Sequence, residues 1–266
     1  MSTTKDIREA MVRIVNKNKI AQCFRQAMDT YDGQATVQRR VSSRLLTLAG
    51  QIPTISYERV LEIGCCTGLL TRMLCQQQRV ETLFLNDLVA DFMDPVMARI
   101  PADRRPGLLP LFGDIETLSL PDRLTLTISS ATFQWLADLP GLLHRLAQAL
   151  RDDGFLVFSI FGPGTLKEFT ELTGVGLDYR TPDQIAGLLE QDFVVEQMVS
   201  EEDQLLLPTP RDVLYHLRAT GVGGVRTYRW TSSGLRRFEQ EYQARFGTPD
   251  GVPVTYASTC FIASKK

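Results

Sequence analysis

Long hydrophobic runs are missing from this 266-residue chain. No apolar stretch approaches the roughly 20 residues that a helix needs to span a bilayer. The first 20 residues, MSTTKDIREAMVRIVNKNKI, mix charges and lack the apolar core of an export signal. We therefore expect a cytoplasmic protein with no membrane partner.

Histidine is scarce, and the cysteines lack the spacing of metal ligands. The chain has two histidines, His144 and His216, and an odd total of five cysteines. Zinc sites use spaced Cys and His ligands, so the adjacent Cys65 and Cys66 make a poor chelating pair. A disulfide between such neighbours would be strained. We predict no metal site and reduced thiols.

An excess of charge of either sign is also absent. The formal net charge is -2, and the sequence pI is near 5.8. A broad basic face for a nucleic-acid backbone is therefore not expected. The small basic pairs Arg39–Arg40 and Arg104–Arg105 are interpreted as solvated surface. We predict no nucleic-acid partner.

Short apolar strands alternating with helices dominate the first part of the chain. Hydrophobic residues make up 44% of the sequence, which suffices for one large core. After a mainly helical region that includes residues 36–49, strands are predicted over 59–64, 81–87, 108–114, 123–130 and 154–161. Helices are predicted over 69–77, 91–100 and 139–150. This alternation is typical of an α/β fold with a mostly parallel sheet covered on both faces.

The second half is less regular. Helices are predicted over 164–174, 181–191, 209–221 and 232–247, and strands over 193–200 and 252–265. Thr209 as N-cap and Pro210 at the first position mark one helix start. The last strand alternates apolar and polar residues, which favours antiparallel pairing. We expect one domain over 1–266, with an N-terminal helical lid (1–50), a ligand-binding core (57–165) and a helical insertion at about 200–245.

A glycine turn follows the first predicted strand in the stretch RVLEIGCCTGLLTRML, residues 59–74. Gly64 and Gly68 bracket the turn, and glycine permits positive φ and close approach to a ligand. The dinucleotide pattern G-x-G-x-x-G and the P-loop ending G-K-[ST] are both absent. Glu62, one residue before the turn, suits a ligand with an ammonium group and would repel a pyrophosphate.

Two further acids follow the next strands. Asp87 ends the second strand, about twenty residues after the glycines, where a carboxylate accepts hydrogen bonds from ribose hydroxyls. Asp114 ends the third strand and precedes the apolar Ile115, a pair suited to an adenine edge and face. Acids at three successive strand ends indicate a cationic nucleoside ligand.

Together, VLEIGCCTG, Asp87, GDIE and LRDDGFLVFSIFGPGTL resemble the class I S-adenosylmethionine-dependent methyltransferases. The resemblance implies a Rossmann-like, mostly parallel seven-stranded sheet whose last strand is antiparallel. S-adenosylmethionine is the implied cofactor, with contacts from Gln38, Glu62, Gly64, Cys65, Gly68, Asp87, Leu88, Asp114, Ile115 and Ser130. The family usually has glycine where Cys66 stands, so a positive φ there would bring strain.

The fold does not identify the methyl acceptor. The Asn/Asp-Pro-Pro-aromatic motif of nucleic-acid amino-methyltransferases is absent, because the corresponding position is SSATFQW. The stretches TYD…A…Q, QW…DLP and FGPGTL…E are similar to those of the malonyl-acyl-carrier-protein O-methyltransferases of biotin synthesis, and the similarity covers nearly the whole chain. It implies acyl carrier protein carrying a malonyl thioester as partner. Tyr31 and Gln38 then belong to a lid over the cofactor, and Gln134 and Trp135 lie at the mouth of the active site.

A malonyl carboxylate is already ionised at pH 7, so its methylation needs no general base. Aligning it with the methyl group provides most of the rate. A cation should hold this carboxylate, and Arg218 is preferred among Arg39, Arg40, Lys167, Arg211, Arg218, Arg226 and Arg229. Two alternatives stay open: a small-molecule carboxylate methyltransferase with an aconitate-like acceptor, and a cofactor-binding protein impaired in catalysis. The oligomeric state is not predicted.

Overall fold

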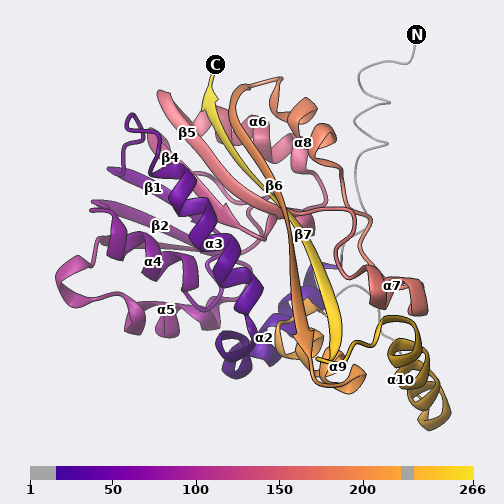
Figure 1. Ribbon diagram of the computed structural model, residues 1–266. Coiled ribbons are helices and arrows are strands. Elements are labelled where there is room, and N and C mark those ends of the chain that lie inside the picture. Colours follow the sequence, from indigo (N-terminus) through magenta and orange to yellow (C-terminus); the bar gives the residue numbers. More distant parts are fainter. Residues whose placement is uncertain (1–15, 223–230) are drawn as a thin grey trace.

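The computed structural model describes residues 16–222 and 231–266. Its centre is a seven-stranded sheet in the order β3-β2-β1-β4-β5-β7-β6 (Figure 1). The strands are β1 (Arg59–Ile63), β2 (Thr82–Asp87), β3 (Gly107–Phe112), β4 (Leu124–Ser130), β5 (Leu150–Phe161), β6 (Phe193–Leu207) and β7 (Val252–Lys265). The predicted α/β fold is thereby confirmed.

The strands from β3 through β5 pair in parallel, whereas β7 pairs antiparallel with both β5 and β6. The antiparallel last strand was predicted from its alternating pattern and is confirmed. Strand order reverses between β1 and β4, and in open α/β sheets ligands bind outside the carboxyl ends at such a point. Because β7 runs the other way, its early residues reach the carboxyl end of β5, where Phe161 pairs with Ser258.

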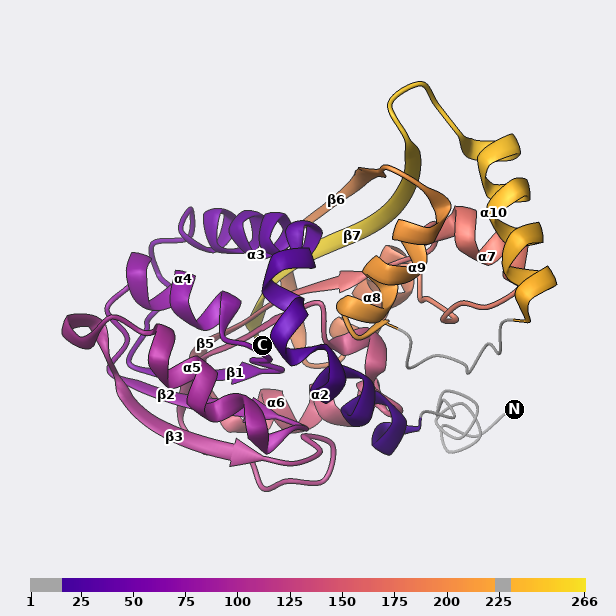
Figure 2. The ribbon, with the colours of Figure 1, turned by 90° about the horizontal axis from the view of Figure 1, so that it is seen from below.

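Helices cover both faces of the sheet, as the buried apolar strands require. One buried cluster joins the sheet to α3, α4 and α5, and the other joins it to α6 and α8. Figure 2 shows α3, α4 and α5 together on the same side of the strands. The bounds of these helices are α3 (Thr36–Ala49), α4 (Leu69–Gln77), α5 (Met93–Arg99), α6 (Leu139–Ala149) and α8 (Pro182–Leu189).

The remaining helices form a cap beyond the carboxyl ends of the strands. They are α2 (Lys17–Gln34), α7 (Lys167–Thr173), α9 (Pro210–Ala219) and α10 (Ser232–Phe246). A third apolar cluster holds α7, α9 and α10 against the start of β7. The predicted start of α9 is confirmed, because Thr209 is the N-cap, Pro210 is the first helical residue, and Thr209 and Asp212 form a reciprocal capping box. Short 3-10 turns span Ala90–Phe92, Ala102–Arg104 and Phe133–Trp135.

Three expected element boundaries need correction. β5 begins at Leu150, four residues before the predicted strand over 154–161. β6 does not stop at residue 200 but runs to Leu207, so the first residues assigned to a helical insertion are strand. The charged run Glu201, Glu202 and Asp203 hid this, because an edge strand tolerates charged side chains that a central strand does not. The predicted helix over 91–100 begins as a 3-10 turn before α5. The helical pattern expected from Ile7 to Val15 lies outside the described residues.

No helix within residues 16–222 and 231–266 is both long and apolar enough to cross a membrane.

Candidate active site

A cavity of about 1020 Å³, counting its open mouth, lies across the carboxyl ends of the strands. Its lining follows the sheet order from the end of β3 through β2, β1, β4 and β5 to the start of β7. We call the part at β3, β2 and β1 the nucleoside end, and the part at β5, β7 and α9 the acceptor end. Ten residues that the sequence placed at the site line this cavity: Tyr31, Gln38, Gly64, Asp87, Leu88, Asp114, Ile115, Ser130, Gln134 and Trp135.

The turn between β1 and α4 is built around positive φ angles. Gly64 has φ 75° and Gly68 has φ 83°. A Cβ at position 64 would lie 2.2 Å from Oγ1 of Thr132, so only glycine fits there. The N–H groups of Gly64 and Cys65 both donate to the carbonyl oxygen of Asn86, at 2.9 and 3.0 Å. These bonds join the turn to the end of β2 and fix the wall of the cavity.

Cys66 lines the cavity with φ 47°, the left-handed conformation that glycine usually occupies. We predicted backbone strain at Cys66 if its φ were positive. Because φ is positive, this strain is present. The backbone N–H of Cys66 donates to Oδ2 of Asp87 at 2.8 Å. That hydrogen bond helps to hold the unusual conformation in place.

Asp87 is the buried carboxylate at the end of β2. Its Oδ1 accepts from the N–H of Val89 at 2.8 Å, and its Oδ2 from Cys66. Burial raises the pKa of Asp87 to about 6, although these backbone hydrogen bonds act in the opposite direction. The carboxylate is therefore mostly ionised at pH 7 and can accept further hydrogen bonds from a ligand's hydroxyl groups.

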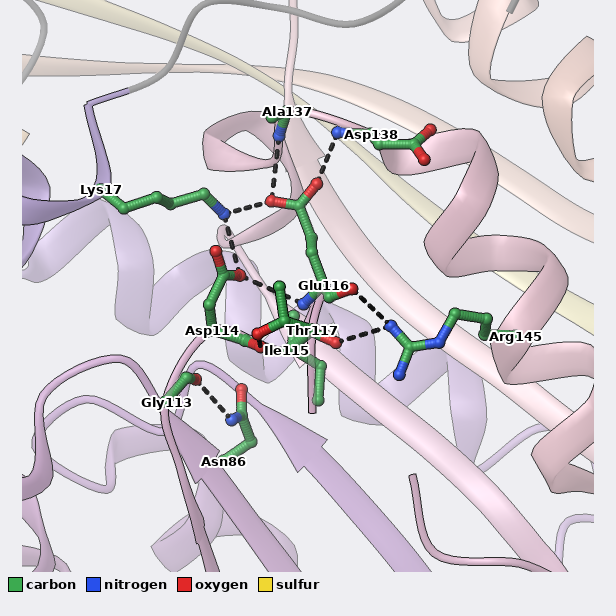
Figure 3. Close-up of polar contacts among 10 residues, drawn as sticks. All are labelled: Lys17, Asn86, Gly113, Asp114, Ile115, Glu116, Thr117, Ala137, Asp138 and Arg145. Carbon is green, nitrogen blue, oxygen red and sulfur yellow. Dashed lines mark hydrogen bonds and ion pairs between the residues drawn. The ribbon is translucent and has the colours of Figure 1, made fainter. Parts of the chain in front are cut away.

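The loop after β3 forms a polar junction with the start of α2 (Figure 3). Lys17 donates to Oδ1 of Asp114 at 3.2 Å and also pairs with Glu116. The Glu116 carboxylate in addition accepts from the N–H groups of Ala137 and Asp138. Glu116 thus connects the Asp114 loop, the start of α2 and the segment that follows Trp135.

Arg145 of α6 supports the same loop from behind. Its guanidinium donates to the carbonyl oxygens of Ile115 and Glu116, at 3.1 and 2.7 Å (Figure 3). On the other side, Nδ2 of Asn86 donates to the carbonyl of Gly113 at 3.1 Å. The conformation of Asp114 and Ile115 is therefore set by side chains from α6 and β2.

The helix α2 covers the mouth between the two ends. The ring of Phe24 meets Trp135 edge-on, with centroids 5.9 Å apart, and lies 6.3 Å from Tyr31. Asp32 accepts from Oγ1 of Thr67 at 2.6 Å, which ties α2 to the glycine turn. These contacts place Tyr31 and Trp135 where the sequence predicted them; their parts in catalysis stay predictions.

Two buried amide oxygens at the cavity are without a partner among the described residues. They are Oε1 of Gln38 and Oε1 of Gln134, in residues that both line the cavity. Buried polar atoms are normally satisfied, so their free state indicates a donor supplied by a ligand. An ammonium group is such a donor. With the acid at Asp87 and the apolar Leu88 and Ile115, the lining fits a nucleoside joined to an amino acid, which is the chemistry of S-adenosylmethionine.

Four residues expected at the site do not line the cavity. Glu62 is fully buried, because side chains alternate along β1 and Ile63 takes the cavity side. Burial raises the pKa of Glu62 to about 8, so it is mostly neutral at pH 7 and does not offer the expected charge. Cys65 packs in the core under α4, and Gly68 only begins that helix. Arg218 is exposed, because it lies two residues from His216 and Thr220, on the other side of α9.

None of the described Arg and Lys residues that we expected to bind the acceptor carboxylate lines the cavity. Among the described residues that line the cavity, Lys17 is the one cation, and it is paired with two carboxylates. The other described candidates contact partners elsewhere. Arg39 donates to the carbonyl oxygen of Asp32. Three form ion pairs: Arg40 with Asp203, Lys167 with Glu202 and Arg211 with Glu239. Arg226 and Arg229 lie outside the described residues. In the described ranges, no group of three or more His, Cys, Asp or Glu residues could hold a metal ion.

Sequence reasoning missed several residues that the fold brings to the cavity. Lys17, Phe24, Asn86 and Thr132 line its nucleoside end and mouth, and Tyr256 lines its acceptor end. Asn86 adjoins Asp87, so its position at a strand end was an available signal. Tyr256 had none, because it is one of several apolar or aromatic residues in a strand that reaches the site only through antiparallel pairing.

Comparison with protein families gives a match to a model described as "Methyltransferase domain" over residues 61–158. Relatives named malonyl-[acyl-carrier protein] O-methyltransferase align over most of the chain. The protein of Bacteroides thetaiotaomicron is 34% identical over 264 residues, which is 95% of this chain and 99% of the relative. That of Calditerrivibrio nitroreducens is 34% identical and covers 91% and 94%. That of Acinetobacter baylyi is 34% identical and covers 94% and 98%.

Solved structures share the fold at low sequence identity. A candidate methyltransferase from Bacillus halodurans superposes with a TM-score of 0.61 at 14% identity, covering 84% of this chain and 97% of the other. The [4+2]-cyclase SpnF also superposes, with a TM-score of 0.55 at 13% identity, covering 85% and 80%. The fold alone therefore does not determine the reaction, whereas the relatives named above share 34% identity over 91–95% of this chain.

Proposed function

The chain belongs to the malonyl-[acyl-carrier protein] O-methyltransferase family, and from this premise we propose that it methylates the free carboxylate of a malonyl thioester carried on acyl carrier protein. S-adenosylmethionine is the methyl donor, and the product is the methyl ester. The observation that carries the proposal is the single cavity that continues from Asp87 past Ser130 to Tyr256. Donor and acceptor can meet there without leaving the protein.

When bound, S-adenosylmethionine supplies a methyl group on a positively charged sulfur. The acceptor carboxylate forms the new O–C bond as the C–S bond breaks, which leaves S-adenosylhomocysteine, and no proton is transferred. The reaction therefore needs no general base. Burial lowers the pKa of His216 to about 4, so this histidine is neutral at pH 7 and is a weak base. Acceptors that must first lose a proton would need a base at the acceptor end, where the described lining residues include no carboxylate and no imidazole.

The described residues act by binding and by excluding water. Asp87 holds the ribose hydroxyls, and Asp114 and Ile115 hold the base. Phe24 and Tyr31 of α2 close the mouth over the reacting atoms together with Trp135, so that alignment in a dry site provides the rate. Methylation removes the acceptor's charge and leaves a thioester that resembles a fatty-acyl primer, in keeping with an early step of biotin synthesis.

Initial rates with different acceptors test this function. We expect methyl transfer to malonyl-acyl carrier protein to exceed transfer to aconitate, the small-molecule alternative, at equal concentrations. Comparable rates on many free acids would favour a small-molecule methyltransferase instead. Calorimetry with S-adenosylmethionine addresses the non-catalytic alternative, since a protein that binds the cofactor but transfers no methyl group to either acceptor would contradict the proposal.

A further inference from the structure

A buried histidine–tyrosine pair lies at the acceptor end of the cavity. Nε2 of His216 is 2.8 Å from the hydroxyl oxygen of Tyr256. His216, on α9, has no exposed surface, and Tyr256, on β7, lines the cavity. The carbonyl oxygen of His216 accepts from Oγ1 of Thr220 at 2.8 Å, which holds the end of α9.

The second ring nitrogen of His216 determines the direction of the hydrogen bond. Nδ1 is buried and has no partner among the described residues. A neutral imidazole carries one N–H, and a buried N–H without an acceptor costs more than an unpaired lone pair. The N–H is therefore on Nε2, where it donates to the Tyr256 oxygen. The phenolic proton of Tyr256 must then point to another acceptor.

The hydroxyl of Tyr256 is hydrogen-bonded to Nε2 of His216, and Tyr256 lines the cavity, so its own proton is available to an acceptor that enters there. The ring is held by Phe161, with centroids 5.4 Å apart, and burial raises the pKa of Tyr256 so that it keeps its proton. A phenol that accepts one hydrogen bond becomes a better donor of its own. The acceptor end therefore presents a fixed, neutral hydrogen-bond donor.

A carboxylate entering this end requires donors, because a buried charge without partners is strongly disfavoured. The one cation among the described lining residues, Lys17, lies at the opposite end and is paired with Asp114 and Glu116. A neutral donor also suits the reaction, since a phenol neutralises less of the nucleophile's charge than a guanidinium does.

We propose that the Tyr256 hydroxyl donates a hydrogen bond to the carboxylate of the methyl acceptor, and that Nε2–H of His216 orients this hydroxyl. Tyr256 is the residue that touches the substrate, and His216 is a positioning residue. The inference rests on the proposed function, because it takes the acceptor to be a carboxylate. It replaces the exposed Arg218 as the group that recognises the malonyl end.

Binding of malonyl- and acetyl-acyl carrier protein, measured with S-adenosylhomocysteine present, tests the assignment without turnover. The two ligands differ only in the carboxylate. For Tyr256→Phe we expect affinity for the malonyl form to fall about 10- to 100-fold, with affinity for the acetyl form unchanged. An equal loss for both ligands, or no loss for either, would overturn the assignment.

Tyr242→Phe is the matched control. Tyr242 is also fully buried and its hydroxyl donates to the carbonyl of Pro253 at 2.7 Å, but it does not line the cavity. It should lower the melting temperature without changing the ratio of malonyl to acetyl affinity. A changed ratio in this control would show that any disturbance of the cap weakens malonyl binding, which would also overturn the assignment.

Two substitutions at His216 test the positioning role. His216→Phe removes Nε2–H and should weaken malonyl binding about 3- to 10-fold, again without effect on the acetyl form. His216→Gln places an amide N–H near the position of Nε2 and should restore most of the loss. If the Phe and Gln variants bind the malonyl form equally, His216 does not orient Tyr256.

Methyl transfer measured with the wild type and with Tyr256→Phe distinguishes a failure of the proposed function from a failure of the role assigned to Tyr256. If the wild type methylates malonyl-acyl carrier protein and Tyr256→Phe does so with the same KM, the function holds and the assignment of Tyr256 fails. If the wild type does not methylate this acceptor at all, the proposed function fails, and the assignment of Tyr256 with it.

Discussion

The two ends of the cavity differ in how the chain builds them. The nucleoside end comes from consecutive strand ends within residues 63–116, where each side chain follows its strand directly. The acceptor end combines β5, α9 and β7, which are far apart in the sequence. Local motifs can therefore encode the first end, whereas only the folded sheet creates the second. The hydrogen-bonding groups differ as well, with carboxylates at the first end and hydroxyls around a neutral histidine at the second.

The largest expected effect concerns Glu62, which supports the nucleoside end from inside the core. Burial raises the pKa of Glu62 to about 8 in the folded state, from its ordinary value of 4.5. The folded state holds the proton more tightly, so the Glu62 contribution to stability is lost as pH rises from about 5 toward 8. Relative to Glu62→Gln, the wild type should lose about 3 kcal/mol of unfolding free energy over this range.

Denaturant unfolding at pH 5 and pH 8 measures this difference. Glu190→Gln, at an exposed position, is the control and should show no such pH dependence. If the unfolding free energies of Glu62→Gln and the wild type change in parallel with pH, then Glu62 is not a buried neutral carboxyl. It could then still face a ligand's charge.

Next in size is the loss of Asp87, the buried carboxylate at the nucleoside end. Asp87→Ala should weaken S-adenosylmethionine binding by about 1–3 kcal/mol, because it removes a charged hydrogen-bond acceptor. Because the pKa of Asp87 is about 6, wild-type affinity should also fall as pH drops below 6. Calorimetry checks both effects, with the exposed Asp122→Ala as control. Unchanged affinity would mean that the ribose lies elsewhere.

A smaller effect is expected from Glu116, which joins the lid to the nucleoside end. Glu116→Gln weakens the pairing with Lys17 and the hydrogen bonds from Ala137 and Asp138. Cofactor affinity should fall by about 1 kcal/mol, while the binding difference between malonyl and acetyl carrier protein stays the same. Glu241→Gln, in an exposed pair with Arg237, should change neither quantity. A loss of malonyl discrimination in Glu116→Gln would show that the two ends are coupled.

The smallest effect is expected at Cys66. Cys66→Gly relieves left-handed strain but adds freedom to the unfolded chain, so stability should change by less than about 1 kcal/mol. Cys66→Val should destabilise clearly, because a branched side chain tolerates φ 47° poorly. Melting temperatures compare the two variants. A strongly destabilised Cys66→Gly would indicate that packing of the thiol, and not the backbone, governs this position.

Much of the fold was accessible from the sequence because the signals were local. Apolar runs marked the strands around the site, Thr209 and Pro210 marked the start of α9, and alternation marked the antiparallel β7. The end of β6 was missed, since edge-strand charges conceal periodicity.

Strand ends were enough to predict that Asp87 and Asp114 line the cavity. The direction of a side chain could not be predicted in the same way. The glycine turn suggested a charged Glu62, but the alternation of β1 turns that side chain into the core. Arg218 lay in the correct helix but on its outer side, two residues from His216. Tyr256 could not be chosen from its sequence context, because antiparallel pairing across the sheet is what brings it to the cavity.

The most direct test of the central claim is the mass of the acceptor after incubation of the wild-type protein with S-adenosylmethionine and malonyl-acyl carrier protein. We predict that the malonyl form gains one methyl group as an ester on its free carboxylate, and that the acetyl form gains none. A malonyl form without added mass, or an acetyl form methylated equally, would contradict the account of a cavity that joins a nucleoside end to a carboxylate-binding end.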